Sequence, residues 1–284
     1  MADVCITEYT DPGCPWAYSA EPFRRRLAWL YGDAIEWQVA LVGLAADPDE
    51  YIDKGFTPER QSAAFKRISR EHRMPIDTSV RERMSATIPA CRAVIAARLH
   101  APEAMRSLLR RLRIRHFSGE LLDAPETIAA AATDAGLDPA VLRQWAAGDD
   151  VTAALEADMA RAREPLAAAR VLDAKLANWS GGRRYTCPSY EIVRKADGVR
   201  IAVPGFQPFP VYDVVLANLV PGLHRREPAQ SAAEVLAWTG TPLATQEVAV
   251  VRDLPFEEAH EELSRVAVHH PLGYDGFWTL PEER

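Results

Sequence analysis

The pattern of hydrophobic and polar residues predicts a strand–helix–strand unit at the start of the chain. Residues 4–10 and 35–41 are rich in β-branched and aromatic residues and alternate with period two, which is typical of strands. Between them, residues 16–30 place apolar side chains at helical spacing, and Gly32 offers a left-handed stop. Pro22 lies inside this helical pattern. Because an internal proline costs a helix about 3 kcal/mol, we expect a kink or a break there.

The middle of the chain predicts helices and no strands. Alternating patterns are absent from Thr57 to Trp179, and this stretch is rich in alanine and arginine. Helix starts recur along it, with proline at or near the first helical position, at Thr57-Pro58, Ala124-Pro125 and Asp138-Pro139. We therefore expect residues 57–179 to form an all-helical insertion.

Strand patterns return after the insertion. Residues 185–193 predict a strand interrupted by Pro188, and Asp197-Gly198 predicts a hairpin turn before a partner strand over 199–203. Gly181-Gly182-Arg183-Arg184 lacks the Lys-Ser/Thr of a phosphate-binding loop and is interpreted as an ordinary loop. With a last helix over 209–219, residues 1–56 and 180–227 supply what one mixed sheet flanked by helices requires.

The last 57 residues predict a separate module. Residues 231–238, 243–251 and 255–267 have helical patterns, and residues 276–280 predict a strand, which together is the layout of a winged helix-turn-helix. Residues 228–284 carry three Lys and Arg against ten Asp and Glu, so they hold the whole net charge of −7 while residues 1–227 balance at zero. This charge asymmetry favours a module distinct from the rest.

The charges of this module argue against nucleic-acid binding. The helix that would read DNA in a winged helix carries four carboxylates, which would repel phosphates: Glu257, Glu258, Glu261 and Glu262. We expect no nucleic-acid partner, and we expect the acidic module to serve a protein partner or self-association.

The composition indicates the class of protein and the cellular location to expect. The chain has 284 residues, of which 48% are hydrophobic and 26% charged, an ordinary globular composition. It contains no run of about 18 apolar residues, and its first residues lack the apolar stretch of a signal peptide. We therefore expect an intracellular, cytoplasmic protein without membrane association. The seven histidines show no convincing ligand spacing, so no metal site is expected.

Among the four cysteines, Cys14 has the context of a reactive thiol. No Cys-x-x-Cys pair occurs, and Cys5 and Cys91 lie in a predicted strand and a predicted helix, where we expect them to be core residues. Cys14 follows a strand and a turn and precedes Pro15 at the start of a helix. Unpaired backbone N–H groups at a helix start stabilise a thiolate and lower its pKa.

The segment around Cys14 resembles a known family. Asp11-Pro12-Gly13-Cys14-Pro15-Trp16-Ala17-Tyr18, followed by Ala20-Glu21-Pro22, is similar to the active-site segment of DsbA-like thioredoxin-fold proteins of the FrnE type. Residues 115–120 and 135–138 resemble the helical insertion of that branch, and residues 185–189 fall at its cis-proline strand. The resemblance covers about residues 3–223. The Asp-Pro-x-Cys-Pro and Glu-Pro elements are also similar to thioredoxin-like adaptors that deliver proteins to a bacterial protease.

The resemblance implies an α/β fold: a thioredoxin-like mixed sheet with an all-helical insertion, followed here by the winged-helix-like module. It implies that Cys14 is a nucleophile and that Cys187 lies against its sulfur, before a cis Pro188. An extended substrate would pair beside Cys14 along Thr186 and Pro188. The other substrate-binding residues implied are Pro15, Trp16, Ala17 and Tyr18, with the two aromatic side chains lining the groove.

One departure from the family bears directly on the chemistry. The dithiol enzymes have a second cysteine where this chain has Ala17, so a mixed disulfide on Cys14 cannot be resolved in the usual way. A small thiol such as glutathione could resolve it as a co-substrate, Cys187 could resolve it, or the groove could bind without turnover. The predictions are accordingly a monothiol thiol–disulfide oxidoreductase acting on a protein or small-molecule disulfide, a non-catalytic adaptor or, more weakly, a glutathione-dependent transferase or isomerase. No other cofactor is expected.

Overall fold

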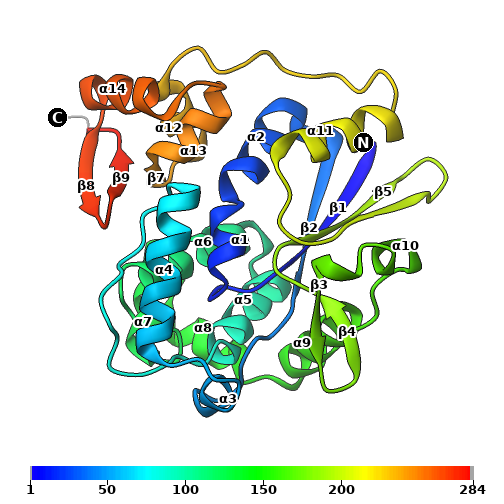
Figure 1. Cartoon of the computed structure of the whole chain (residues 1–284), viewed down its shortest axis with the longest axis vertical. Coiled ribbons are helices and arrows are strands. Elements are labelled where there is room, and N and C mark those ends of the chain that lie inside the picture. The colour runs from blue at the N-terminus through cyan, green and yellow to red at the C-terminus, as the bar shows by residue number, and fades with distance from the viewer. Residues whose placement is uncertain (1, 282–284) are drawn as a thin grey trace.

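A four-stranded mixed sheet lies at the centre of the computed structural model, which describes residues 2–281 (Figure 1). The strand order is β2-β1-β5-β6. β1 (Val4–Thr10) runs parallel to β2 (Ile35–Leu41) and antiparallel to β5 (Ser189–Arg194), which pairs with β6 (Arg200–Val203). The two predicted parts of the sheet, nearly 150 residues apart in sequence, are therefore joined at the β1–β5 pair.

The first helical segment breaks at Pro22, as the sequence predicts. α1 (Pro15–Ser19) ends before Ala20, and α2 (Glu21–Tyr31) begins with Pro22 in its first turn, where the missing N–H leaves no helical bond unmade. Gly32 follows α2 with a positive φ of 46° and opens the short 3-10 helix η1 (Gly32–Ala34) that leads into β2. α11 (Phe209–Leu219) packs in the same apolar core as α2 and the sheet.

The insertion consists of helices packed around α5 (Ile88–His100), which has buried residues on all its faces and a core of alanines. Most of these helices begin with proline in the first turn, as predicted. The remaining helices, in chain order, are α3 (Asp49–Asp53), α4 (Pro58–His72), α6 (Pro102–Phe117), α7 (Pro125–Asp134), α8 (Pro139–Ala146), α9 (Asp149–Ala162) and α10 (Ala167–Arg170).

The end of the predicted insertion is not helical. After the 3-10 helix η2 (Asp173–Lys175), β3 (Leu176–Trp179) and β4 (Gly182–Tyr185) form a separate two-stranded sheet. The predictions of helices only up to Trp179 and of a loop over 181–184 are both wrong here. These strands are too short and too exposed to show an alternating pattern, and Gly182 enters its strand with φ of +125°, which only glycine adopts readily. The predicted domain boundaries remain predictions.

The C-terminal residues form three helices and a small sheet (Figure 1, orange and red). The order α12 (Ala232–Thr239), β7 (Leu243–Ala244), α13 (Thr245–Arg252), α14 (Phe256–Val266), β8 (Val268–Leu272), β9 (Asp275–Thr279), with strands arranged β7-β9-β8, follows the plan of a winged helix. The helix predicted over 243–251 begins only at Thr245. β8 was not predicted because it is an exposed edge strand containing Pro271, which breaks the alternation.

A buried carboxylate fastens this module to the rest of the molecule. Glu247 on α13 is fully buried and accepts hydrogen bonds from Nε of Arg25 on α2 at 2.7 Å and from Nη2 of Arg110 on α6 at 2.5 Å. Its second oxygen also accepts from the backbone N–H of Ala244 at 2.8 Å. One carboxylate thus joins a thioredoxin-fold helix, an insertion helix and the C-terminal module.

Some acidic residues of the module pair with cations in the rest of the molecule, and the expectation that the module serves a protein partner or self-association stays a prediction. Asp253 pairs with Arg26 at 2.6 Å and Glu257 with Arg73 at 2.8 Å. The wing is also packed inwards, because a Cβ on Gly273 at its tip would collide with the Ile76 carbonyl oxygen. These contacts use part of the module's negative charge, while the side chains of Asp253 and Glu257 themselves stay largely exposed.

We expect Glu247→Ala to lower the free energy of unfolding by about 3–5 kcal/mol, because it removes the buried carboxylate that two buried guanidinium groups share. Urea unfolding followed by circular dichroism measures this. Glu258→Ala, on the exposed face of α14 with no charged partner among the described residues, is the matched control and should change stability by less than about 0.5 kcal/mol. Equal losses in the two variants would contradict the assignment.

Candidate active site

Cys14 is positioned by the turn that links β1 to α1. The backbone N–H of Cys14 donates to the Asp11 carbonyl at 3.2 Å, and the Cys14 carbonyl accepts the first helical bond from Tyr18 N–H at 3.0 Å. Pro15 occupies the first helical position. Cys14 is therefore the N-cap residue of α1, so its sulfur lies beside backbone N–H groups that have no helical partner.

The side chain of Asp11 holds this turn in place. Its carboxylate accepts hydrogen bonds from the N–H of Gly13 at 2.8 Å and of Leu44 at 3.0 Å, and from Oγ1 of Thr87 at 3.0 Å. Cys91 Sγ donates to the same carboxylate at 3.5 Å. Burial nevertheless raises the pKa of the Asp11 carboxyl. Asp11 thereby connects the Cys14 turn to the segment after β2 and to the start of α5.

The structure brings Cys187 to Cys14. The Cys187–Pro188 peptide bond is cis, as the resemblance implies, and Cys14 Sγ donates to the Cys187 carbonyl oxygen at 3.3 Å. Ser189 supports this loop, because its Oγ donates to the Thr186 carbonyl at 2.8 Å and accepts from Gly205 N–H at 2.9 Å.

The pKa values of the two thiols are shifted in opposite directions. The hydrogen bond from Cys187 lowers the pKa of Cys14, and the N–H groups of Ala17 and Trp16 add to this effect, which together outweigh burial and the Asp11 charge. Burial raises the pKa of Cys187 well above its usual value, and the hydrogen bond to Cys14 and the Cys14 charge raise it further. The first proton that the pair loses therefore comes from Cys14, while Cys187 keeps its own.

Only part of the predicted groove lining is accessible. Cys14 is 6% exposed and Cys187 4%, Ala17 and Pro188 are buried, and Pro15, Trp16 and Thr186 are half-buried. Tyr18 is fully buried, which corrects its assignment as a groove residue. Its ring stacks on Phe117 of α6 and its hydroxyl donates to the Pro75 carbonyl at 3.0 Å. Ala17 likewise belongs to the apolar core that surrounds the two thiols.

Trp16 meets two residues that sequence reasoning missed. Its indole ring makes edge contacts with His72 at the end of α4 and with Phe206 in the loop after β6, at centroid distances of 5.3 and 5.8 Å. No local pattern could have found them, because they come from segments 56 and 190 residues from Trp16 in sequence.

The other cysteines differ from each other: Cys91 is a buried core residue as predicted, whereas Cys5 is partly exposed at the sheet surface.

Among residues 2–281, no group of three His, Cys, Asp or Glu side chains is arranged to hold a metal ion. Within the same residues, no helix has the length and apolar character needed to cross a membrane.

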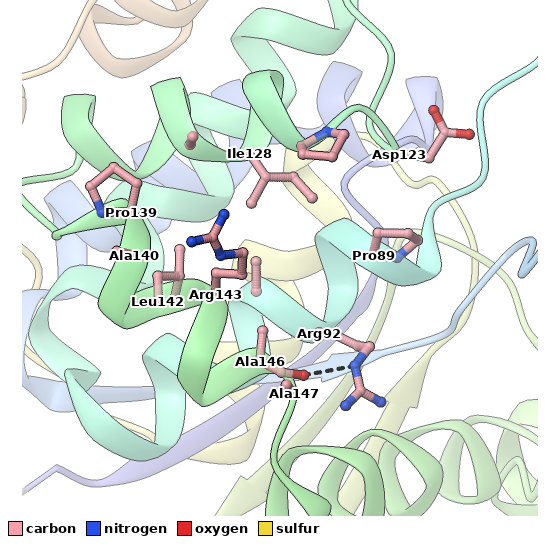
Figure 2. Close-up of a pocket in the computed structure, with 13 residues that line it drawn as sticks. Pro89, Arg92, Asp123, Ile128, Pro139, Ala140, Leu142, Arg143, Ala146 and Ala147 are labelled. Atoms are coloured by element: carbon pink, nitrogen blue, oxygen red, sulfur yellow. Dashed lines mark hydrogen bonds between the residues drawn. The ribbon is translucent and has the colours of Figure 1, made fainter.

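An apolar pocket of about 530 Å³ lies away from the thiols, between α5, α7 and α8 (Figure 2). Small or aliphatic side chains line it, including Ala93, Ile128 and Leu142. Arg92 at its edge is engaged, because its Nε donates to the Ala146 carbonyl at 2.8 Å at the end of α8. The pocket contains no thiol or histidine.

The fold and the site together define a class. A parallel β1–α–β2 unit with an N-capping cysteine, completed by an antiparallel strand that begins at a cis-proline facing that cysteine, is the arrangement of thioredoxin-fold proteins. The family model described as thioredoxin matches residues 8–166, more than half of the chain, and the chain belongs to this family.

Comparison with individual proteins agrees with this family. The chain is 25% identical to a protein of Halalkalibacterium halodurans named ClpXP adapter protein SpxH, over 98% of this chain and 89% of the relative. A solved structure of a probable DsbA oxidoreductase from Streptomyces coelicolor matches 80% of this chain and 93% of its own, with a TM-score of 0.57 and 18% identity. The cytosolic disulfide reductase DsbM from Pseudomonas aeruginosa matches 76% and 100%, with a TM-score of 0.52 and 16% identity. The predicted DsbA-like thioredoxin fold is confirmed.

Because thiolates react and thiols do not, a lower pKa means that Cys14 alkylates at lower pH than an ordinary thiol, whose pKa is about 8.5. We expect Cys187→Ala to remove the hydrogen bond that favours the thiolate and to shift the alkylation profile of Cys14 to higher pH. Iodoacetamide labelling across pH, resolved by peptide mass spectrometry, measures this. Cys5→Ser is the control and should leave the profile unchanged; an unshifted profile in Cys187→Ala would disprove the role of the thiol pair.

Proposed function

We propose that this protein is a thiol–disulfide oxidoreductase in which Cys14 is the nucleophile and Cys187 the resolving thiol. The observation that carries the proposal is the contact between the two cysteines at the start of α1, together with the opposite directions of their pKa values. Ala17 occupies the position of the usual second thiol. The chemistry therefore uses one thiol from the helix and one from the loop before Pro188.

The proposed reaction begins with attack of the Cys14 thiolate on one sulfur of a disulfide R–S–S–R′. A Cys14–S–S–R bond forms, the substrate S–S bond breaks, and R′–S⁻ leaves and takes up a proton. Cys187 then loses its proton and attacks Cys14 Sγ, releasing R–S⁻ and forming a Cys14–Cys187 disulfide. The substrate gains two electrons and the cysteine pair loses two.

The charge arrangement supports this order of steps. Besides burial, the Cys14 charge and the hydrogen bond to Cys14 raise the pKa of Cys187. Once Cys14 is in a mixed disulfide, its negative charge is gone, and only burial and the more distant Asp11 charge still favour the protonated Cys187 thiol. The first step thus lowers the pKa of the group needed for the second.

Return to the reduced state requires two equivalents of a thiol, which attack the Cys14–Cys187 disulfide in turn and leave as their own disulfide. A small intracellular thiol such as glutathione has this chemistry. The proposal therefore includes a reducing, cytoplasmic setting, in which thiol pools are maintained.

We expect Cys14→Ser to abolish reduction of oxidised glutathione and of a peptide with one internal disulfide, because a hydroxyl cannot replace the thiolate. Cys187→Ala should still release the first thiol, but a Cys14 mixed disulfide should accumulate and be seen as an added mass on the intact protein. Cys5→Ser provides the control and should react like the parent. Unchanged turnover in Cys14→Ser would refute the proposal.

A non-catalytic adaptor is the second candidate, and two observations favour it. Two relatives at 25% identity, each matched over most of its length, are named ClpXP adapter protein SpxH. The thiols here are also nearly inaccessible, and the helix lacks the usual second cysteine. In this role the thioredoxin fold would bind a protein partner through the surface around Trp16, Thr186 and Pro188.

The adaptor role predicts that Cys14→Ala, which keeps the site apolar and small, binds a partner protein with the affinity of the parent. Pull-down by Cys14→Ala and parent protein in parallel, together with the turnover assays above, separates the two functions. Full binding without turnover of either disulfide in the parent would establish the adaptor; loss of binding in Cys14→Ala would contradict it.

A further inference from the structure

A segment that shares an apolar core with the two thiols has a charge opposite to that of the whole protein. Residues 161–184 run from the end of α9 through α10 and η2 to the β3–β4 hairpin (Figure 1, green). They carry six Lys and Arg against two Asp and Glu, a net charge of +4 in a chain whose net charge is −7. We call the outer side of residues 161–184 the basic face.

Four of the six cations on this face are not neutralised by carboxylates among residues 2–281. Arg170 Nε donates to the Pro165 carbonyl at 3.2 Å, Lys175 Nζ to that of Phe206 at 3.5 Å, and Arg184 Nη1 to that of Tyr185 at 2.8 Å. The guanidinium of Arg163 lies over the Trp179 ring at 5.0 Å. The other two have acidic partners: Arg161 pairs with Glu191, and Arg183 pairs with Asp173.

Large apolar side chains stand among these cations. Val171 is 82% exposed, and Leu172 and Trp179 are also exposed. Exposed aliphatic residues next to one another, beside cations that pair with no carboxylate, form a surface that can dock another molecule. Exposed cations and exposed apolar side chains together favour a partner that has both anionic groups and apolar side chains.

The inner side of the same segment forms the wall of the thiol site. Ala162, Ala169 and Leu176 belong to the apolar core that contains Cys14 and Cys187. Burial raises the pKa of Cys187, and the positive charge of Arg184 acts in the opposite direction. A molecule bound on the basic face would therefore lie on the outer side of a segment whose inner residues pack in the same core as the cysteines.

We infer that the basic face is the docking surface for an acidic protein segment that carries exposed apolar side chains. Its carboxylates pair with Arg163, Arg170, Lys175 and Arg184, and its apolar side chains cover Val171 and Leu172. Where the proposed exchange operates, this surface selects acidic substrates and delivers them beside Cys187. Docking itself does not depend on thiol chemistry.

A protein segment fits this face better than a single-stranded nucleic acid. Both would satisfy the cations, and Trp179 could stack on a base. Val171 and Leu172, however, have no π-face to stack on and are the most exposed apolar groups here. Aliphatic side chains gain most from covering by other apolar side chains.

The test measures binding by fluorescence anisotropy on Cys14→Ser protein, so that no exchange occurs. The probe is a fluorescein-labelled peptide in which Glu alternates with Leu and Phe; the comparison probes are its twin with Lys for Glu and a labelled oligothymidylate. We expect the acidic peptide to bind at least about tenfold more tightly than the basic twin, with an affinity that falls as salt is added.

The matched variants reverse two charges each. Arg170→Glu with Lys175→Glu should weaken acidic-peptide binding about tenfold, because two exposed cations become anions at the docking surface. Lys66→Glu with Arg67→Glu makes the same change of net charge on the exposed face of α4 and should leave binding as in the parent. Val171→Ser with Leu172→Ser should weaken binding while keeping its salt dependence.

Equal binding of the two peptides, equal losses in the two charge-reversal pairs, or tighter binding of the oligothymidylate would each overturn the inference. None of these outcomes would contradict the proposed exchange reaction, because that reaction is tested by turnover in protein that retains Cys14. Conversely, loss of turnover in the parent would not affect the binding result.

Discussion

Three buried carboxylates on three different parts of the chain require cations, and one helix supplies most of them. Glu8 on β1, Glu21 on α2 and Glu247 on α13 are all nearly inaccessible. Burial opposes the ionisation of Glu21, but the surrounding guanidinium groups, led by Arg24 and Arg113, hold its pKa well below the usual range. α6 contributes Arg106 to Glu8, Arg110 to Glu247 and Arg113 to Glu21. Because an unpaired buried charge is far more costly than the pair, none of these parts can separate without a large penalty.

This network reaches the thiol site. Arg113 also donates to Oγ1 of Thr10, the last residue of β1, immediately before Asp11. Glu21 opens α2, directly after the short helix that Cys14 caps. The ion pairs therefore fix both sides of the Cys14 turn, while Asp11 fixes its centre through Gly13, Leu44 and Thr87. The position of Cys14 relative to Cys187 thus depends on the insertion as much as on the thioredoxin sheet.

The sequence predicts those features that depend on local geometry. Period-two alternation located β1 and β2, prolines located helix starts, and the Cys14-Pro15 turn was found from its neighbours alone. It could not predict the arginines of α6 as core residues, since charged side chains are rarely buried and such a helix face is typical of a solvent-exposed surface. The resemblance implies a groove position for Tyr18, and nothing in the local pattern shows that Phe117 and Pro75 will cover it. The meeting of Cys14 and Cys187, 173 residues apart, came from the resemblance and not from spacing.

Placing the second thiol in the loop before Pro188 changes what oxidation would do to the site. In a Cys-x-x-Cys helix both sulfurs lie on one element, whereas Cys14 and Cys187 belong to opposite sides of the site. A disulfide between them would join the start of α1 to the loop that leads from β4 into β5 and would occupy the position where a substrate meets Cys14. Ala162, Ala169 and Leu176 of the segment 161–184 share an apolar core with the same two cysteines. The two cysteines and residues 161–184 therefore contribute to one apolar core. Because protein interiors are close-packed, a movement of the cysteines on oxidation must be accommodated by this segment, and a movement of the segment by the cysteines.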